Sequence, residues 1–404
     1  MDIKDKLYQL TGDSRNKAAA ADKEEESSAY SDSKSGKNEE DFQQDGAHHI
    51  EREVLGPQYK HGKYSLQQIS ERLFPQACFL LNRDRGVNRE EVLFLDTETT
   101  GLAGGTGTCA FMVGMGYFSE SELILEQHLM RDFDEEHSLL TAIKNRLESR
   151  PVPVTFNGKT FDIPLLKNRF ILQRLNFPDC KTHLDLLHPS RRMWKHLSSC
   201  SLNNLERNLL NFYRKNDIDG SEVPRYYRAY LENKNWQLLK PIFKHNKYDI
   251  ISLAMLSFHL DRVACPEGDY NHTPQEYYNL GRQLEKLNCR QQSIYCYEKA
   301  LESSDRRRLQ QRVEEKLTWQ YKRENVYEPA VNIWNAMIES GRGGLFPYIE
   351  LAKFYEHQQK SYQPALKICR RAEAYLHEKR TIIEKWREKK DKLQHRIERL
   401  ESKL

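Results

Sequence analysis

Apolar residues follow two different patterns along this chain, and the change from one to the other divides it into two folded parts. In the first part, short apolar runs rich in β-branched and aromatic residues indicate strands. These runs are residues 92–97, 109–118, 123–131 and 152–156. Apolar residues at helical spacing predict helices at 135–147, 163–175, 189–195, 201–210, 222–233 and 241–260. Strands in series, followed by alternating helix and strand, predict an α/β fold with a mixed sheet flanked by helices.

In the second part, the apolar spacing is helical throughout and repeats itself. A small residue recurs at Ser293, Ala330 and Ala365, close to the roughly 34-residue period of tetratricopeptide repeats. We therefore predict an all-α repeat domain over residues 270–376, with an irregular helical bundle as the alternative. The last stretch, 377–404, is predicted as one charged helix that caps the repeats, with a short coiled coil as the alternative.

The N-terminal end carries neither pattern. Residues 1–47 are rich in Ala, Ser, Lys, Glu, Asp and Gln, so they lack the apolar surface that offsets the entropy of ordering. We expect this segment to be a disordered tail. A lead-in segment, 48–90, follows it, with a short helix expected at 65–73.

Composition and charge narrow the class of protein. No apolar run approaches about 18 residues, the length that a membrane-spanning helix needs, and the first residues carry no apolar signal core. Eight cysteines without CxxC spacing are typical of reduced thiols, so we expect a cytoplasmic protein with no membrane partner. Residues 1–47 carry 12 acidic and 7 basic side chains, a net charge of −5. The total of +4 therefore leaves +9 on the remainder, a modest attraction for a polyanion.

Two carboxylates, Asp96 and Glu98, stand at the end of the apolar run 92–97. Side chains at positions i and i+2 of a strand point to the same face. Two like charges held together in a partly buried setting raise each other's pKa unless a cation neutralises them. Carboxylate oxygens suit a hard divalent cation, so the pair predicts metal-assisted phosphoryl chemistry if further carboxylates converge on it.

Two more elements supply such groups. Asp162 lies where the run 152–156 gives way to a helix, a position at the carboxyl edge of the sheet where sites of α/β proteins form. Taken alone, it is equally well explained as a cap of that helix. His245 and Asp249 share one face of the helix 241–260 and can point together into the sheet. Without the other acids, they would be an ordinary surface pair.

The order of these groups resembles a known family. Asp-x-Glu, then Asp, then His before Asp, spread over about 150 residues, is similar to the DEDD superfamily of 3′→5′ exonucleases, which has the ribonuclease H-like fold. Other segments look like those of its YprB-type branch, in which this domain precedes tetratricopeptide repeats. These segments are residues 184–194, 200–206, 217–220, 223–224 and 245–253. The resemblance covers roughly residues 50–376 and implies an exonuclease domain over residues 91–269.

Carried over by position, the resemblance assigns roles to single residues. It implies that two divalent cations, Mg²⁺ or Mn²⁺, are bound by Asp96, Glu98, Asp162 and Asp249. It makes His245 the general base that takes a proton from the attacking water. Three residues separate His245 from Asp249, where the histidine subclass commonly has four, so the resemblance fixes this histidine less firmly than the acids.

The resemblance also extends to the substrate. It implies that the nucleotide approaches residues Thr99, Thr100, Leu102 and Asn157. Basic residues near the acidic motifs are candidates for phosphate contacts, although a solvated surface explains them equally well. They are Lys159, Lys167, Arg169, Arg191, Arg192 and Lys195. His183 and Asp185 are interpreted as groups that orient neighbouring structure.

The function implied by this resemblance is that of a metal-dependent 3′→5′ exonuclease acting on DNA in repair, with a helicase as the partner bound by the repeats. Two alternatives stay open. A ribonuclease of the same fold is one, because no sequence feature indicates how a 2′-hydroxyl would be read. A repeat-based scaffold with an inactive nuclease domain is the other, although all five expected site residues are present.

Overall fold

The computed structural model describes residues 47–69, 72–83, 86–101, 107–180, 182–381 and 383–404. The tail predicted at 1–47 therefore lies outside the described residues, except for Ala47. Leu102, expected beside the nucleotide, lies outside them as well.

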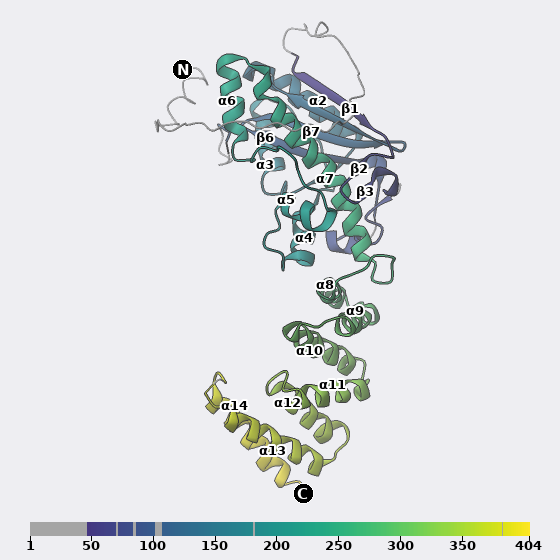
Figure 1. Ribbon diagram of the computed structural model, residues 1–404, viewed down its shortest axis with the longest axis vertical. Helices are drawn as coiled ribbons and strands as arrows, with labels where there is room; N and C mark the ends of the chain where they lie inside the picture. The colour runs from purple at the N-terminus through teal and green to yellow at the C-terminus, as the bar shows by residue number, and fades with distance from the viewer. Residues whose placement is uncertain (1–46, 70–71, 84–85, 102–106, 181, 382) are drawn as a thin grey trace, which may run out of the picture. The chain divides into compact units, whose positions relative to one another are not determined.

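A six-stranded sheet forms the centre of the first folded part among the described residues (Figure 1). Its strands are, in spatial order, β1 His49–Leu55, β8 Glu122–Leu129, β7 Ala110–Ser119, β6 Val92–Thr99, β9 Val152–Thr155 and β10 Leu184–Asp185. β1, β8, β7 and β6 pair antiparallel, whereas β6, β9 and β10 run parallel. The predicted mixed sheet is confirmed, and its parallel strands bring their carboxyl ends to one edge.

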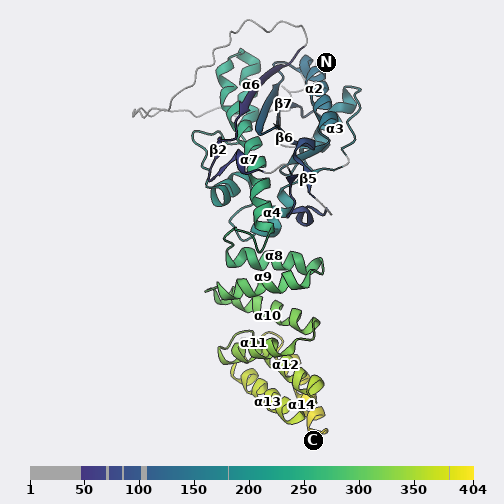
Figure 2. The same ribbon diagram turned by 90° about the vertical axis from the view of Figure 1, so that its right-hand side faces the viewer.

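Helices cover both faces of this sheet. They are chiefly α2 Glu136–Ser149 and α3 Asp162–Leu172 on one face, and α7 Lys240–Ala264 on the other. Phe94 of β6 packs in the same apolar core as Ile250 of α7, whereas Leu95 packs in the core that contains α2 and α3. Figure 2 shows α7 on one side of β6 and β7, with α2 and α3 on the other. Because side chains alternate along a strand, the even-numbered residues of β6 face α7.

The segment 48–90 contributes more than the expected lead-in. Its strand β1 pairs along its whole length with β8 and forms one edge of the sheet. The helix predicted at 65–73 is wrong apart from one 3₁₀ turn, Leu66–Gln68, because its apolar residues are buried while the chain turns into short strands. Those strands are β2 Lys60–His61, β3 Tyr64–Ser65, β4 Arg72–Leu73 and β5 Val87–Asn88. Further 3₁₀ turns lie at Cys78–Leu81, Arg89–Glu91, Phe133–Glu135 and Trp236–Leu238.

The remaining helices of this part begin and end near their predicted positions. They are α4 Leu187–Trp194, α5 Leu202–Leu205 with the π-helical turn Glu206–Leu210 that continues it, and α6 Val223–Asn233. Pro241 lies in the first turn of α7, where its missing N–H leaves no helical hydrogen bond unmade. None of the described helices is long and apolar enough to cross a membrane.

The second part consists of helices packed in sequence order. They are α8 Pro274–Lys286, α9 Arg290–Glu302, α10 Arg307–Arg323, α11 Tyr327–Glu339, α12 Phe346–Lys353 with the π-helical turn Phe354–Gln358, α13 Tyr362–Glu378 and α14 Trp386–Glu401. Neighbouring helices contact each other along this series. The small residues Ser293, Ala330 and Ala365 of α9, α11 and α13 are fully buried, as the repeat pattern requires. The predicted helical part is confirmed, and α14 packs on α13 through Leu393 and Ile397.

The two parts share a core at their junction. Leu280 and Leu284 of α8 belong to the same apolar cluster as the strand residues that face α7. Trp194 at the end of α4 donates a hydrogen bond from Nε1 to Oε1 of Glu276, at 2.8 Å. Glu276 also closes the capping box of α8 with Thr273. Removal of the repeats would therefore expose apolar core of the sheet domain.

Candidate active site

The carboxylates of β6 point toward α7, as their alternation predicts. Asp96 and Glu98 lie on the same face of the strand as Phe94, whose ring packs in the core under α7. Glu98 is 8% exposed, so its carboxylate is held away from bulk water. The strand ends directly afterwards, at a register shift between Glu98 and Thr99. The two acids therefore stand at the carboxyl edge of the sheet.

α7 brings the second half of the site against this edge. His245 and Asp249 lie one turn apart on the helix, with Nε2 of the histidine 3.4 Å from Oδ2 of the aspartate. Glu98, His245 and Asp249 each offer a ligand atom, and these atoms lie within 4.8 Å of one another. Residues separated by about 150 positions in the chain thus meet in one cluster.

Asp162 is the first residue of α3 and is 4% exposed. Its Oδ1 accepts a hydrogen bond from Oγ1 of Thr97, at 2.5 Å, so β6 fixes the orientation of this carboxylate. Phe161, not Asp162, stands at the N-cap position. The interpretation of Asp162 as a helix cap is thus replaced by a contact with the strand that carries Asp96 and Glu98.

The acids of this cluster perturb one another strongly. Burial, followed by the charges of Asp249, Glu98 and Asp162, raises the pKa of Asp96 well above its usual range. Burial raises the pKa of Glu98 to about 8, against the opposing effect of His245. Burial likewise raises the pKa of Asp162 to about 6, although the hydrogen bond from Thr97 lowers it. The protein therefore holds several carboxylates in a space where they cannot all be charged without a nearby cation.

This donor set fits one or more hard divalent cations. Carboxylate oxygens with a single imidazole are the ligands that Mg²⁺ or Mn²⁺ accepts, and the described cluster contains no thiolate. A bound cation would remove the repulsion that keeps Asp96 and Glu98 protonated. The perturbed pKa values thus agree with the metal-binding role expected for these acids.

Asn246 is a site residue that the sequence analysis missed. Its side chain is fully buried, and Nδ2 donates a hydrogen bond to Oδ2 of Asp96, at 3.0 Å. Gln127 of β8 donates from Nε2 to Oδ1 of Asn246, at 3.1 Å, which fixes the orientation of the amide. Gly114, the partner of Asp96 in β7, provides the space, because a Cβ there would lie 2.1 Å from Oδ1 of Asn246. The position of Asn246, three residues before Asp249 on the same helical face, was the available signal.

Arg214 is a second missed residue, and it lies at the centre of a buried charge network. Its Nη2 donates to Oδ1 of Asp249, at 2.6 Å. Nε and Nη2 also hold the carboxylate of Glu206, at 2.7 and 2.6 Å, in a two-pronged pair. The side chains of Arg214 and Glu206 are 3% and 0% exposed, so both charges depend on this pairing. The guanidinium therefore fixes one oxygen of Asp249 and leaves the other toward the cluster.

Asp217 completes the surroundings of the histidine. Nδ1 of His245 donates to Oδ2 of Asp217, at 2.9 Å, which directs Nε2 toward Asp249 and Glu98. Burial alone would lower the pKa of His245, but the bond to Asp217 and the charges of Asp249 and Glu98 raise it to about 9. Asp217 lies in the segment 217–220, which carried the family resemblance, but its loop gave no periodic pattern from which this contact could be inferred.

The residues expected to contact the nucleotide lie around the same edge. Thr99 and Thr100 stand where β6 ends, and their hydroxyl groups bond to backbone groups of Gly101 and Cys109. Asn157 turns the chain after β9 with a positive φ of 67°, and its Oδ1 accepts a bond from Thr160. These side chains shape the loops beside the acids, and their contact with substrate stays a prediction.

The raised pKa values predict an unusual dependence of stability on pH. Glu98 and Asp162 titrate in the unfolded chain near pH 4, but in the folded chain only at about 8 and about 6. Folded protein thus binds more protons than unfolded protein in this window, and His245, with its pKa of about 9, acts in the same direction up to that pH. Without metal, we expect the free energy of unfolding to fall from pH 5 to pH 8, by roughly 1.4 kcal/mol per pKa unit of net shift.

Divalent cations should counteract this loss, so Mg²⁺ or Mn²⁺ should raise the melting temperature more at pH 8 than at pH 5. Thermal unfolding with metal or chelator at both pH values measures the effect. In Asp96→Asn, which removes one of the coupled charges, the metal effect should shrink. A melting temperature indifferent to metal at both pH values would contradict this account.

Two glycines of β7 allow the role of Asn246 to be tested against a matched control. Gly114→Ala should displace Asn246 from Asp96, whereas Gly116→Ala places its Cβ 2.4 Å from Cγ2 of the apolar Ile250. Both changes overpack the contact between α7 and the sheet, so each should destabilise the fold by about 1–3 kcal/mol. Only Gly114→Ala should also weaken Mn²⁺ binding, by about 10- to 100-fold in calorimetric titration. Equal metal affinity in the two variants would remove Asn246 from the site.

Comparison with known proteins agrees with this arrangement. Residues 93–260, from β6 to most of α7, match the family model of the RNase_H superfamily. The chain is 32% identical to the uncharacterized protein YprB of Bacillus subtilis (strain 168) over 364 residues, which cover 87% of this chain and 85% of the relative. Together with the mixed sheet and the acids at its edge, these matches show that the chain belongs to the YprB-type family of RNase H-like proteins.

Proposed function

We propose that this protein is a metal-dependent exonuclease that removes nucleotides from the 3′ ends of DNA. The observation that carries the proposal is the convergence of the five expected side chains on one edge of the sheet, with Glu98, His245 and Asp249 inside a single cluster. Membership of the RNase_H superfamily supports hydrolysis of nucleic acid. The 3′→5′ direction and the preference for DNA rest on the resemblance to DEDD exonucleases.

Each residue of the cluster has a part in this chemistry. Asp96, Glu98, Asp162 and Asp249 would hold the divalent cations. When bound, these cations lower the pKa of an attacking water and stabilise charge on the phosphoryl and leaving oxygens. Nε2 of His245 faces the same space and would accept the proton of that water. Neutralisation of the neighbouring carboxylates would lower the pKa of His245 toward the value that a general base needs.

The network behind these groups keeps them oriented during the reaction. Asp217 holds Nδ1 of His245, so the ring presents Nε2 and not Nδ1 to the water. Arg214 and Asn246 hold Asp249 and Asp96 in place from the side away from the substrate. Preorganised donors of this kind reduce the rearrangement that the transition state requires.

Digestion of labelled DNA tests the proposal. Asp96→Asn and Asp249→Asn should each lower the rate of nucleotide release on the order of a hundredfold or more, because each removes an acid required for metal-bound charge stabilisation. Oligonucleotides labelled at the 5′ end should shorten progressively in the presence of Mg²⁺ or Mn²⁺, and chelator should stop the reaction. Parallel digestion of RNA separates the ribonuclease alternative.

The control is the thermal stability of each variant in chelator, which should stay near that of the unchanged protein. Full activity of a purified, folded Asp96→Asn protein would exclude the assignment. Release of label from the 5′ end at the first step would refute the direction of digestion while leaving nuclease activity intact.

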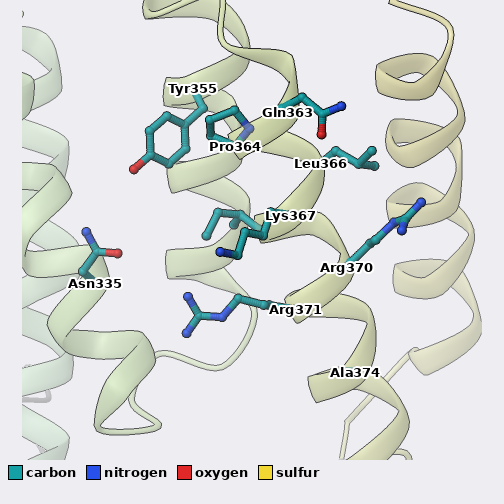
Figure 3. Close-up of a pocket in the computed structure, with 10 residues that line it drawn as sticks. Asn335, Tyr355, Gln363, Pro364, Leu366, Lys367, Arg370, Arg371 and Ala374 are labelled. Carbon is teal, nitrogen blue, oxygen red and sulfur yellow. The ribbon is translucent and has the colours of Figure 1, made fainter. Parts of the chain in front are cut away.

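We further propose that the helical part, which we interpret as tetratricopeptide repeats, binds an acidic segment of a protein partner, and that this partner is a DNA-repair helicase. A hollow of about 950 Å³ lies between α11 and α13. Figure 3 shows Lys367 and Arg371 extending from α13 toward Asn335 of α11, with Tyr355 beside them. The basic character of this hollow favours an acidic partner. A helicase would supply single-stranded ends, and the resemblance to the YprB-type branch suggests it.

The partner proposal is best tested in the full chain, because the repeats share core with the sheet domain. Lys367→Glu combined with Arg371→Glu should weaken binding to a purified DEAH-type helicase of the same organism by at least about tenfold, through repulsion of its acidic segment. Arg308→Glu, an exposed residue of α10, is the control with the same charge reversal per position. Digestion of free oligonucleotides should be unchanged, and helicase binding equal to that of the unchanged protein would contradict the proposal.

A further inference from the structure

A second hollow opens at the same edge of the sheet, beyond the acids. Its volume is about 450 Å³. It is formed by the loop after β9, by β10 and by α4. Its polar lining consists of Lys159, His183, Asp185, His188, Arg191 and Arg192. Apart from the single aspartate, every one of these side chains is a base.

The sheet fixes the distance of this hollow from the acidic cluster. Val154 of β9 pairs with Phe94 of β6 on one side and with Leu184 of β10 on the other. Two strand spacings of about 4.8 Å place Asp185 about 10 Å across the sheet from the end of β6. The charge of Asp185 also raises the pKa of Asp162, which confirms that the hollow borders the acidic cluster. At the 3.4 Å rise of stacked nucleotides, 10 Å corresponds to about three nucleotide steps.

The one acid of the hollow is already satisfied by the backbone. Oδ1 of Asp185 accepts hydrogen bonds from the N–H groups of Asn157 and Leu187, at 2.9 and 3.0 Å. Oδ2 accepts a bond from the N–H of Lys159, at 3.0 Å. Asp185 thereby orients the loop that leads to Asp162, as expected. Its charge is directed to the loop, away from the basic side chains.

The cations of the hollow, in contrast, lack counter-charges. Among the described residues, no carboxylate forms an ion pair with Lys159, Arg191 or Arg192, whereas Arg169, another candidate for phosphate contact, is held by the buried carboxylate of Glu136 at 2.6 Å. Arg192 is partly buried, and burial lowers its pKa without any acid that would raise it. Its Nη2 donates to the carbonyl of Leu80, and its buried Nε finds no partner in the described chain.

The histidine of the lining does not add repulsion against a further cation. Burial lowers the pKa of His183 to about 4, so the ring is neutral near pH 7. Its Nε2 shares a hydrogen bond of 2.8 Å with Oγ1 of Thr155, which fixes the ring at the end of β9. A concave site with unpaired cations, a neutral imidazole and one satisfied carboxylate is complementary to an anion of phosphate size.

We infer that this hollow is a subsite for backbone phosphates of the substrate strand, about three nucleotides on the 5′ side of the bond that is cleaved. The inference rests on the proposed nuclease function and adds a specific contact to it. Arg191 and Lys159 contact the phosphate from the rim, while Arg192 supplies charge from the wall. The subsite binds phosphodiester groups without reading bases, and it holds the strand while its 3′ end lies among the acids.

Binding of oligonucleotides of different length tests this subsite without any need for turnover. The full chain in chelator is mixed with fluorescent single strands of about two, about six and about twelve nucleotides, and affinity is measured by anisotropy at several salt concentrations. The main variants are Lys159→Gln and Arg191→Gln, singly and together, because both residues are exposed and their replacement leaves the core intact. Arg192→Gln is added with its thermal stability as a check, and Arg308→Gln on α10 is the control of equal charge change.

The double variant should bind the longer strands about tenfold more weakly and the dinucleotide as well as the unchanged protein. Its plot of log affinity against log salt concentration should be shallower by about 0.7 per lost phosphate contact. Unaltered affinity for long strands would overturn the inference. An equal loss for the dinucleotide would overturn it too, since the hollow would then hold a terminal phosphate beside the acids. Failure of the nuclease proposal is seen separately, as absence of metal-dependent digestion by the unchanged protein.

Discussion

Repulsion among buried carboxylates is the constraint on which the rest of this structure depends. Asp96, Glu98 and Asp162 all have raised pKa values, so the fold holds them closer together than charged carboxylates tolerate without a counter-charge. Packing of α7 and α3 against the sheet offsets this repulsion when no cation is present. A bound divalent cation relieves it. Part of the packing energy of the fold is thereby converted into affinity for the cation, because binding removes strain that folding has introduced.

The close approach of α7 to the sheet makes this arrangement possible. Gly114 and Gly116 of β7 lie opposite Asp96 and Phe94 of β6, on the face that α7 covers. A side chain at either position would collide with Asn246 or Ile250 of the helix. Absence of side chains on the neighbouring strand thus lets a helical amide reach a strand carboxylate. Helix and strand contribute to one site because β7 yields the space between them.

The pattern of apolar residues was sufficient to predict the sheet, most of its helices and the face on which Asp96 and Glu98 lie, since alternation and helical spacing are local properties. The strand β1 was missed because most of its residues are exposed, as an edge strand allows, so it has no apolar run. Arg214 and Asp217 were missed for a related reason. They lie in a loop without periodicity, and their roles depend on contacts with Glu206 and His245 that only the tertiary structure creates. Periodic signals reveal which residues carry the chemistry, whereas the residues that orient them leave no such trace.

The supports of Asp249 and Asp96 differ in a way that bears on how cations enter the site. Arg214 keeps its positive charge at every accessible pH and occupies Oδ1 of Asp249, so this acid is held in place before any cation arrives. Asp96 is supported by the neutral amide of Asn246, which donates a hydrogen bond but supplies no charge. A cation must therefore displace a proton from Asp96, while at Asp249 it meets an oxygen that is already oriented. Metal binding and proton release are coupled on the β6 side of the site, whereas the α7 side acts as a fixed template. This division explains why the fold combines a permanent buried cation with carboxylates whose charge awaits a second one.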